Sequence, residues 1–161
     1  MSSGFKVFEI GGGKKPAEAV RLLPEALALY REAELRSLGN AIWTHAGFLA
    51  DGNTVVAAIH GYVRDNNLKV SRFAVAEGMR GQGLGRSMLA HVAASWIDDS
   101  GTVSLEPRPS SIPFYERVGL QFDPGRSYET GVAPVAIWSA PAATIIASVD
   151  MRVELPPSLS S

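Results

Sequence analysis

A glycine-rich segment between an expected strand and an expected helix constrains this chain more than any other part of it. Four glycines lie within residues 78–85, at Gly78, Gly81, Gly83 and Gly85. Glycine lets backbone N–H groups approach one another closely, and the N-terminus of the following helix adds a partial positive charge. Arg80 and Arg86 place two full charges beside this turn. The segment therefore predicts a cradle for a pyrophosphate group.

Two common nucleotide-binding motifs do not fit this chain. The dinucleotide fingerprint G-x-G-x-x-G fails in both registers, because Arg86 or Met88 stands where the last glycine is needed. The phosphate loop G-x-x-x-x-G-K-[ST] fails at Gly13, because Lys15 stands in place of the hydroxyl residue. The alternative that stays open at this point is a glycine-rich turn that binds no ligand.

Alternating apolar residues and turn signals predict a mixture of helices and strands along the chain. We expect strands over 5–10, 42–50, 54–63, 68–76, 102–106, 120–122 and 132–139. We expect helices from Pro16 towards Leu38 with a break at Pro24, and then over 84–97 and 110–118. Hairpin turns are expected at residues 51–53 and 65–67. This order predicts a mixed sheet with helices packed against it.

The fourth expected strand shows a slip in its alternation. Leu68 and Val70 share one parity, whereas Phe73 and Val75 share the other. Alternation with a period of two cannot change phase unless one residue is inserted. Two interpretations stay open, namely a bulge near residues 71–72 and a strand that is buried on both faces.

Composition excludes several classes of protein. A chain of 161 residues has the length of one domain. It contains no cysteine, which excludes disulfides, cysteine nucleophiles and thiolate-bound zinc. Fifteen basic and sixteen acidic residues leave no broad basic field for nucleic acid. Neither a metal-ligand spacing, a membrane-spanning stretch nor a signal peptide is visible, so we expect a cytoplasmic protein without metal or membrane.

Two motifs make the chain resemble the GNAT superfamily of acetyl-CoA-dependent N-acetyltransferases. The family's acyl-CoA loop, [Q/R]-x-x-G-x-[G/A], is matched by residues 80–85. A second signature, F-Y-x-x-x-G-[F/L], is matched by residues 114–120. About thirty residues separate the two, with one expected helix and one expected strand between them, as in the family. The resemblance is clear from about Thr54 to Phe122 and extends back to Phe5.

This resemblance implies an α+β fold of the GNAT type. Its mixed sheet of six to seven strands is predominantly antiparallel, with splayed central strands and helices on both faces. The strands over 68–76 and 102–106 would splay, and the phase slip falls where the family has a bulge. We expect a GNAT acetyltransferase domain over residues 1–140. A C-terminal extension over 141–161 is expected to form an extra strand or an arm and then a flexible tail.

The resemblance also implies acetyl-CoA as co-substrate, with no metal. Backbone groups near Phe73 and Val75 would pair with the pantetheine arm in the manner of an added strand. Arg108 stands where many members have an asparagine that contacts the cofactor, so it is a candidate to bind a CoA phosphate or an acidic substrate. The expected pyrophosphate site is formed by Arg80, Gly81, Gln82, Gly83, Leu84, Gly85 and Arg86.

The implied reaction is direct attack of a primary amine on the acetyl thioester. Tyr115 matches the family's tyrosine, which protonates the departing CoA thiolate, and the alternative role for it is aromatic packing. Glu106, at the end of an expected strand, is our candidate for the general base, and the alternative is a solvated carboxylate. A backbone N–H on the splayed strand would stabilise the oxyanion.

Other polar residues have weaker claims to catalysis. His60 lies within an expected strand, where a single histidine is more often structural. His45 and His91 have weaker claims than His60, and Glu77, just before the glycine-rich loop, is interpreted as a solvated turn residue. The expected partner is a small-molecule or peptide amine, and a homodimer is expected as well. Two other functions stay open, namely a non-catalytic acyl-CoA-binding or regulatory module and an assembly protein that uses its C-terminal arm.

Overall fold

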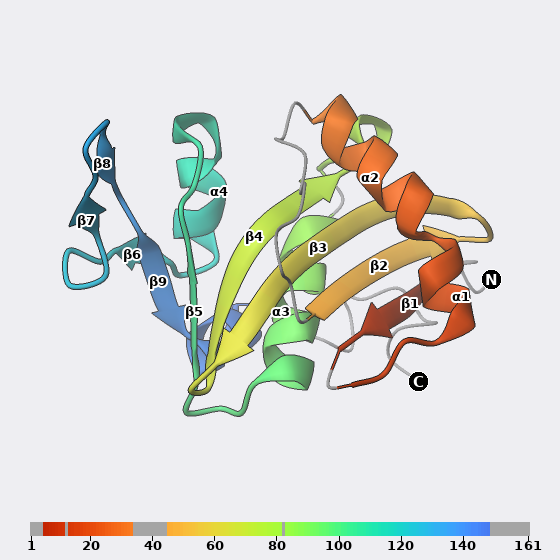
Figure 1. Cartoon of the computed structure of the whole chain (residues 1–161), viewed down its shortest axis with the longest axis horizontal. Helices are drawn as coiled ribbons and strands as arrows, with labels where there is room; N and C mark the ends of the chain where they lie inside the picture. Colours follow the sequence, from red (N-terminus) through yellow and green to blue (C-terminus); the bar gives the residue numbers. More distant parts are fainter. Residues whose placement is uncertain (1–4, 12, 34–44, 82, 149–161) are drawn as a thin grey trace.

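A seven-stranded sheet organises the described part of the chain, with the strand order β1-β2-β3-β4-β5-β9-β6 (Figure 1). The computed structural model describes residues 5–11, 13–33, 45–81 and 83–148. The strands of this sheet are β1 (Phe5–Ile10), β2 (His45–Asp51), β3 (Thr54–Arg64), β4 (Asn67–Val75), β5 (Thr102–Leu105), β6 (Gln121–Phe122) and β9 (Trp138–Pro141). A separate two-stranded sheet consists of β7 (Tyr128–Glu129) and β8 (Pro134–Val135).

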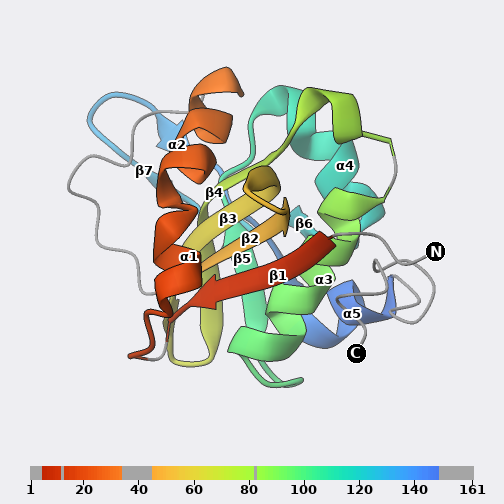
Figure 2. The same cartoon turned by 90° about the vertical axis from the view of Figure 1, so that its right-hand side faces the viewer.

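Helices cover both faces of the large sheet (Figures 1 and 2). They are α1 (Ala17–Arg21), α2 (Leu23–Glu32), α3 (Leu84–Trp96), α4 (Ile112–Arg117) and α5 (Ala142–Ala147), with short 3-10 turns at Glu77–Met79 and Pro109–Ser111. The predicted mixed α+β fold with a predominantly antiparallel sheet is therefore confirmed. Within this sheet, β4 and β5 form a parallel pair. None of the described helices is long and apolar enough to span a membrane.

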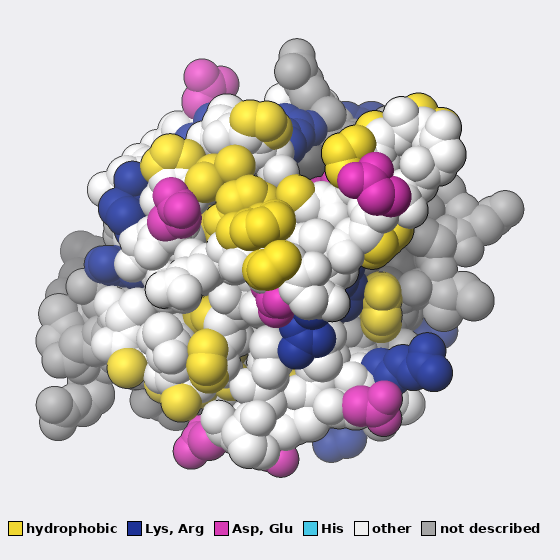
Figure 3. Space-filling view, turned by 90° about the vertical axis from the view of Figure 1, so that its left-hand side faces the viewer, with side chains coloured by type: hydrophobic (Ala, Val, Ile, Leu, Met, Phe, Trp, Pro, Cys, Tyr) yellow, Lys and Arg dark blue, Asp and Glu magenta, His cyan; other side chains and the backbone are white. Residues whose placement is uncertain are grey.

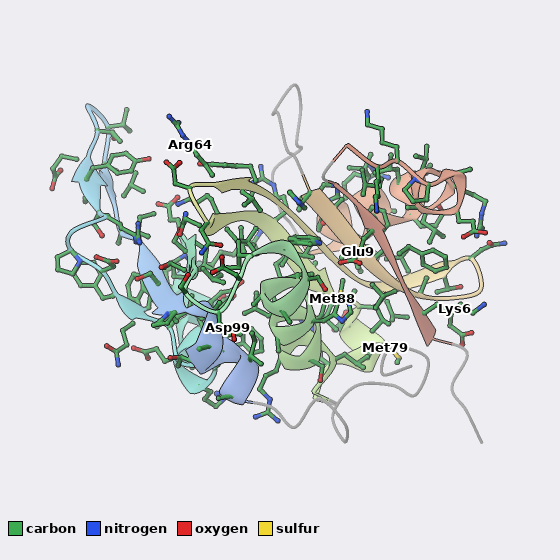
Figure 4. The ribbon with its side chains drawn as sticks, turned by 90° about the horizontal axis from the view of Figure 1, so that it is seen from below. Lys6, Glu9, Arg64, Met79, Met88 and Asp99 are labelled. Atoms are coloured by element: carbon green, nitrogen blue, oxygen red, sulfur yellow. The ribbon has the colours of Figure 1, made fainter. Side chains whose placement is uncertain are left out.

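Two apolar clusters hold the helices against the sheet. On one face, α1 and α2 bury Leu22, Ala26, Leu29 and Tyr30 against Phe48 and Ala58. On the other face, α3 buries Met88, Leu89 and Val92 against Ile59, Leu68 and Val103. Met88 lies between α3 and the sheet in Figure 4. The apolar positions of α3 recur every three or four residues, which is why this helix presents one continuous face to the strands.

A bulge in β4 explains the slip in its alternation. Val70 pairs with Gly61 and Arg72 pairs with His60, so Ser71 is the inserted residue. The prediction of a bulge is therefore confirmed, and Phe73 lies on the face that Val70 occupies before the insertion. The strand changes which residues it shows to each face without changing its direction.

β4 and β5 pair only at their first residues and then diverge. The parallel pairing joins Asn67–Lys69 to Thr102–Ser104. Beyond it, Figure 1 shows β4 curving away towards α2 while β5 runs beside α4. The predicted splay between the central strands is present. From Val70 onwards, no strand in the described part of the chain pairs with this edge of β4.

The C-terminal part of the described chain differs from expectation. The single strand predicted over 132–139 is divided between β8 and β9, which belong to different sheets. β7 was not expected, because two residues are too few to show alternation. Residues predicted to form an extra strand or an arm instead begin with the helix α5, and the predicted boundary between 140 and 141 falls within β9. Short apolar runs of this kind do not distinguish strand from helix.

α5 is part of the core. Ala142 and Ile145 are fully buried in the same cluster as α3. The Ala142 amide donates to the Gly101 carbonyl at 2.9 Å. Thr144 packs where α4 ends, since a Cβ built on Gly119 would lie 2.6 Å from its Cγ2. The helix therefore supports both α3 and the turn that follows α4.

Apolar side chains are exposed at the β6 end of the sheet. Phe122, Tyr128 and Val132 are exposed by 51%, 58% and 98%, and the Phe122 ring lies 5.2 Å from the Trp138 ring. Figure 3 shows hydrophobic side chains gathered on this side of the molecule. Neighbouring exposed apolar groups of this kind are typical of contact surfaces.

We expect Gly61→Ala to destabilise the fold. An added Cβ would lie 2.5 Å from the Lys69 carbonyl oxygen and 3.1 Å from Leu68 Cδ1. The ladder holds this carbonyl in place, so the substitution should cost about 1–3 kcal/mol in the free energy of unfolding, measured with urea. Gly78→Ala is the control, because no atom lies within 4 Å of its Cβ position, and it should change stability by less than about 0.5 kcal/mol. Equal losses in both variants would contradict the close approach at the bulge.

Candidate active site

A groove of about 690 Å³ opens where β4 and β5 diverge. Its walls come from β4, the loop and first turn of α3, the end of β5 and α4, with Ala33 at the end of α2. Gln82 lies outside the described residues. The other residues predicted for the site all line this groove, namely Phe73, Val75, Arg80, Gly81, Gly83, Leu84, Gly85, Arg86, Glu106 and Tyr115. The splay thus brings together segments that lie far apart in the sequence.

The free edge of β4 presents backbone groups to the groove. The Ala76 amide donates to the Val56 carbonyl at 2.8 Å, which fixes the phase of hydrogen bonding between β4 and β3. Bonded pairs alternate along an antiparallel ladder, so Phe73 and Val75 direct their N–H and C=O groups away from β3. Arg80 Nε donates to the Val75 carbonyl at 3.3 Å. This edge can therefore accept an extended ligand as an added strand.

The glycine-rich loop ends in an uncapped helix N-terminus. Gly81 and Gly83 have φ values of 82° and 77°, in the left-handed region that glycine tolerates. Gly83 occupies the N-cap of α3 and has no side chain with which to cap it, and the first turn of this helix carries no acidic residue. A 13-residue helix with this N-terminus favours an anion.

Gly85 lets the first turn of α3 approach the rest of the site. A Cβ built on it would lie 3.2 Å from Val75 Cγ2 and 3.4 Å from Phe114 Cζ. Both distances are tight for a larger side chain. Gly85 is therefore required for close packing, whereas Gly81 and Gly83 are required for their backbone conformation.

The charge of the groove is strongly positive. Its described lining contains five arginines, Arg72, Arg80, Arg86, Arg108 and Arg117, and a single acid, Glu106. Field lines concentrate in a cleft lined by charges of one sign, so anionic ligands are attracted to it. Sequence motifs identified the loop arginines and Arg108 but missed Arg72 and Arg117, because no motif marks them.

Tyr115 is the buried phenol of the groove. Tyr115 is only 8% exposed, and its ring lies 5.1 Å from the Phe114 ring and 6.5 Å from the Phe73 ring. Burial raises the pKa of Tyr115 to about 12. The hydroxyl therefore keeps its proton at neutral pH, which is the form that a proton donor needs.

Glu106 is the single acid in the described lining. It is exposed and follows directly after the last residue of β5. Burial lowers the pKa of Lys69, and the negative charge of Glu106 opposes that shift, which places the two side chains near one another. Alternation along β5 puts Glu106 on the same face as Ser104, opposite to the buried Val103 and Leu105.

None of the three histidines is among the described residues that line the groove. His60 is fully buried, and its Nδ1 is hydrogen-bonded to the Tyr30 hydroxyl at 2.5 Å. His91 Nε2 lies 3.8 Å from a Glu9 carboxylate oxygen, and the His45 ring lies 5.0 Å from the Trp96 ring. Glu9 is labelled between β1 and α3 in Figure 4, away from α4.

The loop after β5 is tied to α2. Arg108 Nη1 donates to the Ala33 carbonyl at 2.8 Å. This carbonyl belongs to the C-cap of α2, where a positive charge is favourable. Arg108 therefore lies at the α2 side of the groove. Among the described residues, no three His, Asp or Glu side chains lie together in a way that would hold a metal ion.

Comparison with known families identifies the class of the protein. Residues 29–135 match the family model described as the acetyltransferase (GNAT) domain. A comparison with curated proteins found no match. Because the family match covers more than half of the chain, the chain belongs to the GNAT acetyltransferase family. It is an acyl-CoA N-acyltransferase by class, as its two sequence motifs implied.

Solved acetyltransferases have the same fold at low sequence identity. The ribosomal-protein-S18-alanine N-acetyltransferase of Escherichia coli gives a TM-score of 0.61 at 18% identity, over 86% of this chain and 94% of that chain. An acyl-CoA N-acyltransferase from Pseudomonas aeruginosa gives 0.59 at 14% identity, over 84% and 98%. A GNAT family acetyltransferase from Elizabethkingia anophelis, with acetyl-CoA bound, gives 0.52 at 12% identity, over 86% and 98%.

We expect His60 to make stability depend on pH. Burial and the charge of Arg72 lower the pKa of His60 from 6.5 to about 4. The imidazole therefore binds a proton more tightly in the unfolded chain than in the folded one. As pH falls from 6.5 towards 4, this difference lowers the free energy of unfolding by at most about 3 kcal/mol. His60→Gln should lose less stability than the native protein between pH 7.5 and 4.5, measured by urea unfolding. Equal losses in the two proteins would contradict this assignment.

Proposed function

We propose that the protein transfers an acetyl group from acetyl-CoA to a primary amine by direct attack. The observation that carries this proposal is the groove at the splay, which holds the glycine-rich loop, the open edge of β4 and Tyr115 together. The acceptor class is a small-molecule or peptide amine.

The residues of the groove fit acetyl-CoA. The loop from Arg80 to Arg86 offers a helix N-terminus and two guanidinium groups for the pyrophosphate. A Cβ built on Gly81 would meet no atom within 4 Å, so the backbone of the loop is open to a phosphate. Phe73 and Val75 would pair with the amides of the pantetheine arm. Acetyl-CoA supplies the activated thioester, and the chain supplies position and proton transfer.

The acceptor amine must lose a proton before it attacks. Glu106 is the proposed base, because it stands at the end of β5 on the rim of the groove. As the C–N bond forms, the carbonyl oxygen gains negative charge, and the N–H of Phe73 at the open edge is placed to donate to it. The C–S bond then breaks, and Tyr115 donates its proton to the sulfur.

The raised pKa of Tyr115 shapes its role. A phenol with a pKa of about 12 is a weaker acid than a thiol, whose ordinary pKa is about 8.5. Proton transfer to the thiolate therefore needs a second proton that replaces the one leaving the phenol. The acetylated nitrogen supplies it, because it is positively charged until the amide forms. In this scheme the acceptor nitrogen loses two protons, one to Glu106 before it attacks and one to Tyr115 after the C–N bond has formed. The sulfur gains one proton from Tyr115, and Tyr115 ends the cycle protonated.

We expect Gly81→Ala to impair acetyl-CoA binding. A side chain at a φ of 82° strains the loop and stands where a phosphate would approach. Gly13→Ala is a matched control, with a φ of 83° and also no atom within 4 Å, outside the residues that line the groove. In a thermal-shift titration, Gly13→Ala should keep the upward Tm shift caused by acetyl-CoA and CoA, whereas Gly81→Ala should need ~10-fold more of either ligand. NAD should shift neither variant. Equal titration curves for the two would count against the loop as the phosphate site.

We expect Tyr115→Phe to lower kcat by ~10²–10⁴-fold, because the thiolate then leaves without a positioned proton donor. Binding of acetyl-CoA should stay within about twofold, since the ring and its packing are kept. Tyr128→Phe is the control, because Tyr128 is exposed and lies outside the groove lining. The rate of CoA release with an accepted amine measures both effects.

The same assay separates the alternatives. Unchanged kcat in Tyr115→Phe would make this residue a packing aromatic. A native protein that binds acetyl-CoA and acetylates no amine would favour the non-catalytic acyl-CoA-binding module. The homodimer stays a prediction, and sizing of the native protein beside Phe122→Ser would test whether the apolar face in Figure 3 forms it.

A further inference from the structure

The groove has a second cationic end, on the side of the sheet that α2 covers. Arg72 lies directly opposite His60 in the β3–β4 ladder, so the two side chains share one face. His60 is hydrogen-bonded to Tyr30 of α2, which identifies that face as the one under α2. The charge of Arg72 also acts on the pKa values of both Tyr30 and His60. Phe73, the next residue, faces the other way towards Tyr115.

Arg108 reaches the same turn of α2 from another segment. Its guanidinium donates to the Ala33 carbonyl, and Ala33 follows Tyr30 by three residues. Residues three apart are neighbours on a helix surface. Arg72 and Arg108 thus approach α2 from two different segments, and both residues line the groove.

This end of the groove is distinct from the phosphate loop. Arg80 and Arg86 belong to the loop and the first turn of α3. Tyr115 lies on the α3 side of β4, so a pantetheine arm at the open edge of β4 would leave the α2 side for the acceptor. Arg72 and Glu106 therefore face the path by which the amine arrives.

Two side chains near Arg72 on the α2 side, His60 and Tyr30, are neutral at neutral pH. Burial and Arg72 lower the pKa of His60 to about 4, so His60 is uncharged at neutral pH. Burial raises the pKa of Tyr30 well above 10, so Tyr30 is uncharged as well. Arg72 Nη1 donates to the Ser71 carbonyl at 2.6 Å, and a guanidinium carries five N–H donors in a planar fork. Such a fork matches the two oxygens of a carboxylate or phosphate.

We propose that the acceptor is a small amine that carries an anionic group beside its amino group, and that Arg72 and Arg108 bind this group while Glu106 meets the amine. The inference rests on the proposed function and names its substrate class. A polycationic acceptor would be repelled by two guanidinium groups, whereas a zwitterion presents one charge to each partner. A small acceptor fits because the cofactor shares a groove of about 690 Å³.

The test compares acceptors that differ only in the anion. Free α- and ω-amino acids are each paired with their carboxamides, and phosphoethanolamine is paired with ethanolamine. We expect one anionic series to exceed its neutral counterparts by ~10-fold or more in kcat/KM, because a charged hydrogen-bond pair is lost in the neutral compound. The carboxylate and phosphate arms show which anion the subsite takes.

Variants locate the effect. Arg72→Gln should lower kcat/KM for the anionic acceptor by ~10–100-fold, so that the ratio of kcat/KM for the anionic and the neutral acceptor falls close to one. The KM for acetyl-CoA should stay within about twofold of the native value. Arg72→Lys should keep part of the preference, because it retains the charge and loses the fork. Arg126→Gln is the control, since Arg126 pairs with Asp123 at 3.1 Å and lies outside the groove lining. It should leave the preference unchanged.

Each outcome decides the proposal. Equal or faster turnover of the neutral compounds would overturn it, as would a preference that survives in Arg72→Gln. A native protein that shows the acetyl-CoA thermal shift and acetylates neutral amines, but neither anionic series, would overturn this inference and leave the proposed function intact. Failure to bind acetyl-CoA at all would instead overturn the proposed function.

Discussion

The close approach of the Lys69 carbonyl to Gly61 underlies the rest of this site. It allows Ser71 to be inserted into β4, and the insertion decides which residues face each side of the sheet. Beyond it, β4 leaves β5, and the groups on this edge no longer pair with β5. An extended ligand can therefore pair with this edge as an added strand. The groove therefore occupies the gap between β4 and β5, and the glycine-rich loop forms one of its walls.

Local signals predicted the parts of the fold that depend on neighbouring residues. Alternation located β1, β3 and β4, and the Asp65-Asn66 turn has the positive φ values that a two-residue hairpin requires. The phase slip within β4 predicted its bulge. The glycine spacing and the Phe-Tyr pair indicated the family. Each of these features spans at most eleven residues, which is why the sequence alone contains it.

Features that depend on distant packing could not be predicted. β7 is two residues long, and nothing in its sequence distinguishes it from a loop. Arg72 shares a face with His60 only because the bulge shifts its parity, and it reaches the groove only because β5 turns away. The apolar run in α5 fits a strand or a helix equally well until α3 offers a surface. In each case the deciding partner lies far along the chain.

The helix α5 connects the end of the described chain to the chemistry of the groove. It packs against α3, whose N-terminus follows the glycine-rich loop, and against Gly119, two residues beyond the end of the helix that carries Tyr115. A chain shortened before residue 142 would lose both supports at once. Activity lost on such shortening would thus report a loosened scaffold, and a fusion partner joined close to α5 would act on the same two helices. For this protein, the C-terminal segment is to be treated as part of the catalytic core in any engineering of its ends.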